Sequence, residues 1–128
     1  ETDAAGMIHF SAYFIYMEQA EHELFRHLGT SVLTEDESGI ISWPRVSASC
    51  DYSRPVTFED ELQIDVGIAR LGEKSITYQF YFMKNDQQVA LGQITSVCCR
   101  IVHGQPPKPI VIPQTYVELL TPYITASS

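Results

Sequence analysis

Basic residues are scarce in this chain. Its 128 residues include 8 lysines and arginines against 16 aspartates and glutamates, which gives a formal net charge of −8. A nucleic-acid-binding surface needs a basic face that displaces counterions from phosphates, so this balance argues against nucleic acid as a partner. No apolar run approaches the roughly 18 residues that a membrane span requires, and no signal-peptide pattern opens the sequence. We therefore predict a protein with no membrane span.

Cysteine is also scarce. Cys50, Cys98 and Cys99 are an odd number, and two of them are neighbours. This spacing fits neither a disulfide framework nor a CxxC metal or redox motif, so we predict reduced, buried thiols in a cytoplasmic protein. The histidines show no spacing with other ligand types, and we predict no metal site.

One long amphipathic helix is predicted from about Ser11 to Leu28. Residues of one helix face recur there at three- and four-residue spacing. Ser11 is a plausible N-cap, and Gly29 stands where a C′ glycine would end the helix. The predicted inner face is Phe14, Met17, Ala20, Glu21, Leu24, Phe25 and Leu28.

After an acidic stretch at 35–39, which we interpret as irregular, the apolar period changes to two. This alternation predicts strands joined by turns at 71–74 and 85–86, and a short helix follows near 116–120. The predicted strands are 45–52, 62–68, 76–82 and 89–102. A helix followed by such strands predicts a single α+β domain over residues 1–128, with the helix on one face of an antiparallel sheet. The other sheet face is also partly apolar, and oligomerisation is the simplest way to cover it.

The first residues place an acid ahead of the helix. Asp3 precedes Gly6 by three residues, and the chain then enters the long helix. Unpaired N–H groups at a helix start attract developing negative charge, and a nearby carboxylate can attack or activate water. Taken alone, an Asp-x-x-Gly segment is more often a turn or a cap.

The segment Asp3-Ala4-Ala5-Gly6, with Tyr13 and the helical runs 18–20 and 23–26 after it, resembles the start of the 4-hydroxybenzoyl-CoA thioesterase family of hotdog-fold proteins. The runs 54–62, 71–75 and 107–113 agree with it in order and spacing. The resemblance implies a five-stranded antiparallel sheet wrapped around one long helix. It also implies a homodimer, often paired into a homotetramer. The family has a strand ahead of the Asp motif, and we expect that first strand to be missing from the numbered chain.

The same resemblance implies roles for residues of the opening segment. Asp3 matches the catalytic acid, which acts as nucleophile or as general base. Phe10 matches the position whose backbone N–H polarises the thioester carbonyl, and Gly6 lets the loop pack closely. His9 stands one place before a histidine found in many relatives, so a structural role is the alternative for it.

Substrate contacts are implied at two further places. Lys74 and Ser75 match a turn near the nucleotide end of coenzyme A, and Arg54 could add positive charge; a solvated turn lysine is the alternative for Lys74. We expect Tyr13 and Met17, with Phe10, to line an acyl pocket, although Met17 could equally be core.

These residues predict an acyl-CoA thioesterase that hydrolyses an acyl or aroyl thioester to free acid and thiol. Coenzyme A enters only as part of the substrate, and no cofactor is expected. The alternatives are a thioesterase for acyl carrier protein and a non-catalytic hotdog module that binds acyl thioesters. Dehydratase chemistry is a third, and it would need a histidine placed differently from His9.

Overall fold

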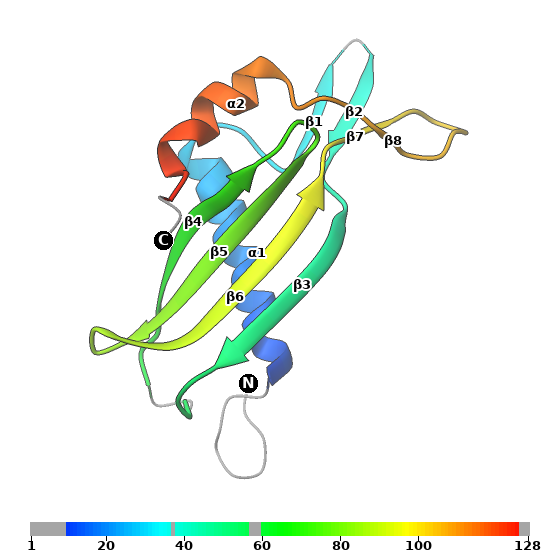
Figure 1. Cartoon of the computed structure of the whole chain (residues 1–128). Helices are drawn as coiled ribbons and strands as arrows, with labels where there is room; N and C mark the ends of the chain where they lie inside the picture. Colours follow the sequence, from blue (N-terminus) through cyan, green and yellow to red (C-terminus); the bar gives the residue numbers. More distant parts are fainter. Residues whose placement is uncertain (1–9, 37, 57–59, 126–128) are drawn as a thin grey trace.

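The structure is a computed structural model, and it describes residues 10–36, 38–56 and 60–125. Its centre is one long helix lying against one face of an antiparallel sheet (Figure 1). The helix is α1 (Phe10–His27), and the sheet order is β3 (Arg45–Tyr52), β6 (Gln87–Val97), β5 (Ser75–Lys84) and β4 (Gln63–Leu71). The predicted α+β architecture is therefore confirmed, with the predicted turn at residues 85–86 in place between β5 and β6.

A second, smaller sheet stands at one end of the first. It consists of β1 (Leu33–Asp36), β2 (Gly39–Ser42), β7 (Cys99–Ile101) and β8 (Lys108–Pro109), in the order β1-β2-β7-β8. Two predictions are corrected here. Glu35, Asp36 and Gly39 of the acidic stretch belong to a β1–β2 hairpin, and the long strand expected at 89–102 is divided at Cys98 into β6 and β7.

The predicted helix boundaries agree closely with the structure at one end. Gly29 has φ +79°, and its N–H donates to the Arg26 carbonyl while the N–H of Thr30 donates to the Phe25 carbonyl. This is the C′ glycine that closes a helix. At the other end α1 already includes Phe10, so Ser11 lies inside the first turn and is not the N-cap.

The core lies between α1 and the main sheet. Tyr78, Phe80 and Phe82 alternate along β5 toward the helix and are fully buried, as the two-residue period predicted. Met17 approaches β6 at Gly92, where an added Cβ would stand 2.1 Å from the methionine Sδ. Glycine at this position thus allows the helix to pack close to the sheet.

The last described residues lie beside the outer edge of β4. After α2 (Gln114–Leu120) and the 3-10 turn η1 (Thr121–Tyr123), the N–H of Thr125 donates to the Ile68 carbonyl at 2.8 Å. The short helix predicted near 116–120 is confirmed as α2. The strand expected ahead of the Asp motif lies outside the described residues.

One carboxylate is buried in the middle of the helix–sheet interface. Glu21 on α1 is 1% exposed and pairs through Oε1 with Nη2 of Arg45 at the start of β3. Burial raises the pKa of Glu21 above its usual value, and the Arg45 charge opposes that shift only in part. The fold therefore favours the protonated carboxyl group more than the unfolded chain does.

Replacing Glu21 by glutamine should change how stability depends on pH. Below the ordinary carboxyl pKa of 4.5 both folded and unfolded chains hold the proton, so burial of a charge costs nothing. As pH rises above that value the native protein loses stability that Glu21→Gln keeps, until the folded pKa is passed. Urea unfolding of both proteins across this range measures the difference. A growing advantage for the native protein toward neutral pH would show instead that the Arg45 pair outweighs desolvation.

Candidate active site

The opening residues of the predicted site fall largely outside the described part of the chain. Asp3, Gly6 and His9 lie outside the described residues, and Phe10 is described only as the first residue of α1. The first N–H groups of an α-helix have no acceptor within the helix, so the start of α1 presents donors that can bind an anion.

An aromatic cluster occupies the same end of the molecule. The Tyr13 ring on α1 lies 4.7 Å from the Tyr52 ring at the end of β3 and 5.0 Å from the Phe82 ring on β5, measured between centroids. Tyr13 and Met17 are 3% and 0% exposed, so within one chain both belong to the core. Tyr52 is 47% exposed and is the member of the cluster that faces outward. Sequence reasoning missed Tyr52, because its contact with Tyr13 joins residues far apart in the chain.

Neither the Tyr13 hydroxyl nor the Cys50 thiol, both near the start of α1, is suited to act as a nucleophile. Burial raises the pKa of the Tyr13 hydroxyl to about 12 and that of the Cys50 thiol to about 11. Both groups therefore stay protonated at neutral pH. Attack on a thioester would need the ionised form, a phenolate or a thiolate. Asp60 is engaged in an ion pair, with its Oδ2 3.2 Å from Nζ of Lys84.

The predicted substrate-binding residues are divided between the two ends of the sheet. Arg54 is exposed just after β3, at the end where α1 begins, and its N–H donates to the Val89 carbonyl. Lys74 and Ser75 stand at the β4–β5 turn, beside the second sheet (Figure 1). The strand β5 between the two ends has 10 residues, which corresponds to roughly 30 Å at 3.3–3.4 Å per residue. The exposed Lys74 and the start of α1 are thus far apart within one chain.

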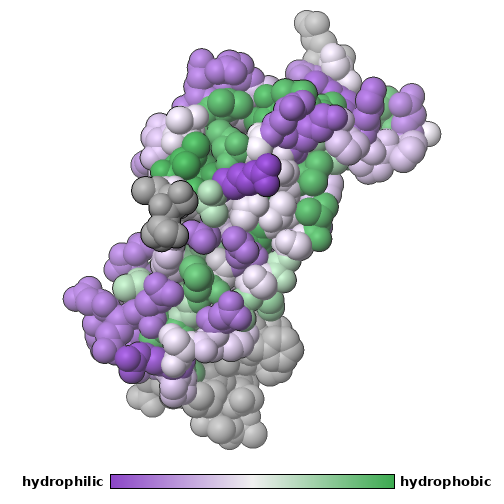
Figure 2. Space-filling model, in the orientation of Figure 1, coloured by the Kyte–Doolittle hydropathy of each residue, from purple (hydrophilic) through white to green (hydrophobic). Residues whose placement is uncertain are grey.

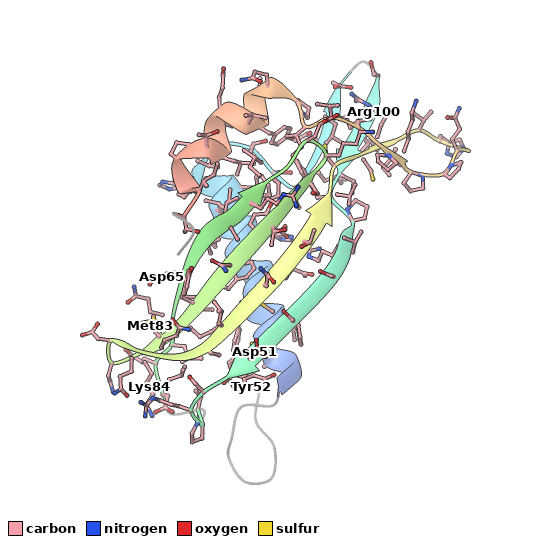
Figure 3. All side chains as sticks on the ribbon, viewed as in Figure 1. Asp51, Tyr52, Asp65, Met83, Lys84 and Arg100 are labelled. Carbon is pink, nitrogen blue, oxygen red and sulfur yellow. The ribbon has the colours of Figure 1, made fainter. Side chains whose placement is uncertain are left out.

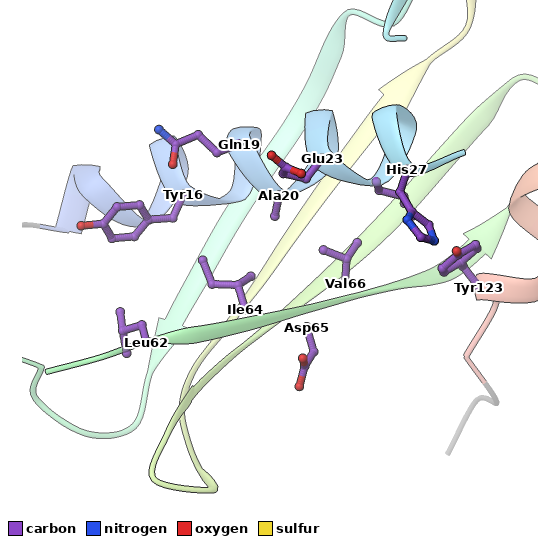
Figure 4. A pocket seen from close by; sticks show the side chains of 11 residues that line it. Tyr16, Gln19, Ala20, Glu23, His27, Leu62, Ile64, Asp65, Val66 and Tyr123 are labelled. Atoms are coloured by element: carbon purple, nitrogen blue, oxygen red, sulfur yellow. The ribbon is translucent and has the colours of Figure 1, made fainter. Parts of the chain in front are cut away.

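A groove opens between α1 and the edge strand β4 (Figure 4). It encloses about 570 Å³, and apolar side chains of β4 form its floor while Asp65 points away from it. Its lining is Tyr16, Gln19, Ala20, Glu23, Leu24, His27, Leu62, Ile64, Asp65, Val66 and Tyr123. The groove shares no lining residue with the aromatic cluster, although its Ile64 pairs with Phe82 across β4 and β5, and it includes none of the predicted site residues.

The sheet face turned away from α1 is mixed in polarity (Figure 2). Thr77 and Thr95 share a hydrogen bond of 3.0 Å across β5 and β6, and Tyr81 donates to Gln79 at 2.7 Å. The acidic side chains of Asp51 and Asp65 belong to this sheet at its two edges (Figure 3).

Metal binding and membrane insertion are two further properties that the described residues bear on. No cluster of three or more histidine, cysteine or carboxylate side chains suited to a metal ion occurs among them. No helix in that part of the chain is long and apolar enough to cross a membrane. The three cysteines are free. Cys98 and Cys99 are buried as predicted, whereas Cys50, also predicted to be buried, is only partly buried.

Comparison with known proteins identifies the family. The profile of the Thioesterase-like superfamily matches residues 1–115. The chain belongs to this superfamily. The predicted hotdog thioesterase fold is confirmed by the solved structure of a gentisyl-coenzyme A thioesterase. That structure is 26% identical, has a TM-score of 0.77, and is matched over 93% of this chain and 90% of its own.

Two sequence relatives agree with this assignment. A protein of Aquifex aeolicus is 28% identical over 120 residues, which are 94% of this chain and 89% of that protein. A 1,4-dihydroxy-2-naphthoyl-CoA hydrolase of Synechococcus elongatus is 28% identical over 99 residues, 77% of this chain and 73% of its own length. The prediction that the chain is a thioester-hydrolysing enzyme is confirmed at the level of the family.

Proposed function

We propose that this protein is an acyl-CoA thioesterase that hydrolyses an acyl or aroyl thioester to a free acid and coenzyme A. The observation that carries the proposal is the family match over residues 1–115, which includes the Asp3 segment directly ahead of α1. Two relatives are named for aromatic CoA thioesters, a gentisyl and a dihydroxynaphthoyl group. Aroyl-CoAs are therefore the first substrates to test.

In the proposed mechanism Asp3 acts as nucleophile or as general base. As a base, it takes a proton from water while the water oxygen bonds to the thioester carbon. The carbonyl electrons move to oxygen, and the Phe10 N–H with the positive end of α1 stabilises that oxyanion. Collapse of the tetrahedral intermediate breaks the C–S bond, and the leaving thiolate takes the proton that Asp3 removed from water, which restores the Asp3 carboxylate. One oxyanion donor of this kind contributes about 3–4 kcal/mol to transition-state stabilisation.

Gly6 and His9 have supporting roles in the proposed mechanism. Gly6 allows the loop that carries Asp3 to pack closely against its surroundings. His9 precedes the first residue of α1 by one position, and we assign it no proton transfer.

We further propose a homodimer formed through the β3 edges, with a tetramer as the possible higher assembly. Among the described strands β3 pairs with β6 alone, and Val46 on it is 61% exposed. Antiparallel pairing of two β3 edges about a two-fold axis would place the Lys74 end of one subunit toward the α1-start end of its partner. This arrangement supports a site that draws Asp3 and Phe10 from one subunit and Lys74 with Ser75 from the other.

Lys74→Ala should weaken recognition of the coenzyme A phosphates without changing the chemical step. An exposed lysine–phosphate contact is worth up to about 1 kcal/mol, so KM for an acyl-CoA should rise by up to about fivefold with kcat retained. Lys108→Ala, an exposed lysine on β8, is the matched control. An equal KM for native protein and Lys74→Ala would show that Lys74 is a solvated turn residue that does not bind the phosphates.

Two other functions make different predictions. A thioesterase for acyl carrier protein would release thiol from carrier-bound substrates only. An acidic carrier should dock on a basic patch, which a chain of net charge −8 is poorly equipped to provide. A non-catalytic module would bind acyl thioesters and release no thiol.

A further inference from the structure

Tyr52, at the end of β3, combines a fixed position with an exposed ring. Its ring packs against that of Tyr13 on the first turns of α1, yet the residue is 47% exposed (Figure 3). An aromatic ring that is held on one side and open on the other can stack on a second flat ring, at centroid separations of about 4.5–7 Å. Tyr52 therefore offers a binding surface for a planar group.

The strand register explains how Tyr13 holds the Tyr52 ring in place. Tyr52 and Phe82 both pair with Ala90, from the two sides of β6. The Tyr13 ring lies 4.7 Å from the Tyr52 ring and 5.0 Å from the Phe82 ring, so it stands over the small alanine, between the two larger side chains. Tyr52 is thus supported by a ring that is itself packed on both sides.

The interior behind Tyr52 is filled by large side chains. Tyr13, Met17 and Phe82 are all buried, and Met17 occupies the space next to Gly92. A long, flexible acyl chain would have to displace these side chains in order to enter between α1 and the main sheet. A flat, compact group can lie on the outer face of Tyr52 without displacing any of them.

Tyr52 also lies close to the proposed reacting group. Phe10 and Tyr13 are three positions apart on α1, which is roughly 4.5 Å along the helix axis at 1.5 Å per residue. The Cα–Cβ bonds of a helix tilt toward its N-terminus, so the Tyr13 side chain points back toward the first turn. Tyr52, in contact with Tyr13, is therefore beside the helix start, where the proposed mechanism holds the thioester carbonyl at the Phe10 N–H.

We propose that Tyr52 selects an aromatic acyl group by stacking its outer face on the aroyl ring of the substrate. This inference rests on the proposed thioesterase function and adds a specificity-determining residue to it. Because Tyr13 already fixes the Tyr52 ring, little side-chain freedom is lost when the substrate stacks on it. An aliphatic acyl group has no ring to stack and gains only the burial of its apolar surface.

Binding of two thioethers that cannot be hydrolysed tests this role without relying on turnover. Phenacyl-CoA carries a phenyl ketone, and acetonyl-CoA carries a methyl ketone in its place. Tyr52→Leu keeps apolar bulk and removes the ring, so calorimetric titration should show Kd for phenacyl-CoA raised by about threefold to tenfold, with Kd for acetonyl-CoA changed by less than about twofold. Tyr52→Phe keeps the ring and should bind phenacyl-CoA within about twofold of the native affinity.

Tyr81→Leu is the matched control. Tyr81 lies on the sheet face turned away from α1 and bonds to Gln79, so its replacement should leave both affinities unchanged. The role of Tyr52 would be overturned by native protein that does not bind phenacyl-CoA, by an unchanged Kd for phenacyl-CoA in Tyr52→Leu, or by an equal rise for both thioethers. Selective loss of phenacyl-CoA binding in Tyr52→Leu, from a protein that releases no thiol from benzoyl-CoA, would support the aromatic site while contradicting the proposed hydrolysis.

Discussion

Asp3→Asn should lower thiol release from the preferred acyl-CoA by a hundredfold or more. The substitution keeps the size of the side chain and removes the negative charge that attacks the thioester or deprotonates water. A positioned general base contributes about 10²–10⁴ to the rate, and loss of a nucleophile costs at least as much. Single-turnover and steady-state rates on the same substrate measure the effect.

Asp65→Asn is the matched control for this experiment. Asp65 is an exposed carboxylate on β4, at the sheet edge opposite β3, and its loss should leave kcat within about twofold, as is usual for surface substitutions away from special features. Thermal unfolding of both variants should match that of the native protein. Activity that survives Asp3→Asn would remove Asp3 from the mechanism.

Phe25→Ala should be the most destabilising of the single substitutions considered. Phe25 is 0% exposed on α1, and its ring centroid lies 6.1 Å from that of Trp43 and 6.3 Å from that of Tyr116. Truncation of a fully buried phenylalanine removes about 3–5 kcal/mol of unfolding free energy, through lost burial and the cavity that remains. Urea unfolding monitored by Trp43 fluorescence, with circular dichroism alongside, measures this loss.

Ile15→Ala on the same helix is the comparison for Phe25. Ile15 is 45% exposed, so its truncation should cost under about 1 kcal/mol. Equal losses of unfolding free energy for the two variants would mean that the face of α1 that carries Phe25 is not the buried one.

The parts of the fold that follow local patterns could be predicted from the sequence. The three- and four-residue spacing identified α1, and two-residue alternation identified β5 with its buried Tyr78 and Phe82. The β1–β2 hairpin could not be found in this way. Its acidic residues look like a solvated loop, but they form a strand by pairing with β2, which in turn pairs with β7, and Asp36 makes an ion pair with Arg100.

The candidate site likewise has parts that the sequence located and contacts between distant residues that it could not reveal. The resemblance located Asp3 ahead of the helix, but no local pattern could reveal that Tyr52 packs on Tyr13 or that Lys74 stands at the far end of the sheet. Periodicity placed Glu21 on the buried face of α1. Its pairing with Arg45, 24 residues away, depends on how β3 docks beside the helix. Contacts between distant residues are set by tertiary packing, which single-sequence periodicity does not encode.

Release of free thiol from a panel of short, long and aromatic acyl-CoAs tests the proposed activity most directly. We predict turnover of at least one member, with the aromatic thioesters foremost, and loss of that turnover in Asp3→Asn. The panel should also include acyl carrier protein thioesters. Thiol release from carrier substrates alone would favour the carrier-protein enzyme. Binding of acyl-CoA by the folded protein without release of any thiol would contradict the thioesterase proposal and leave the binding module.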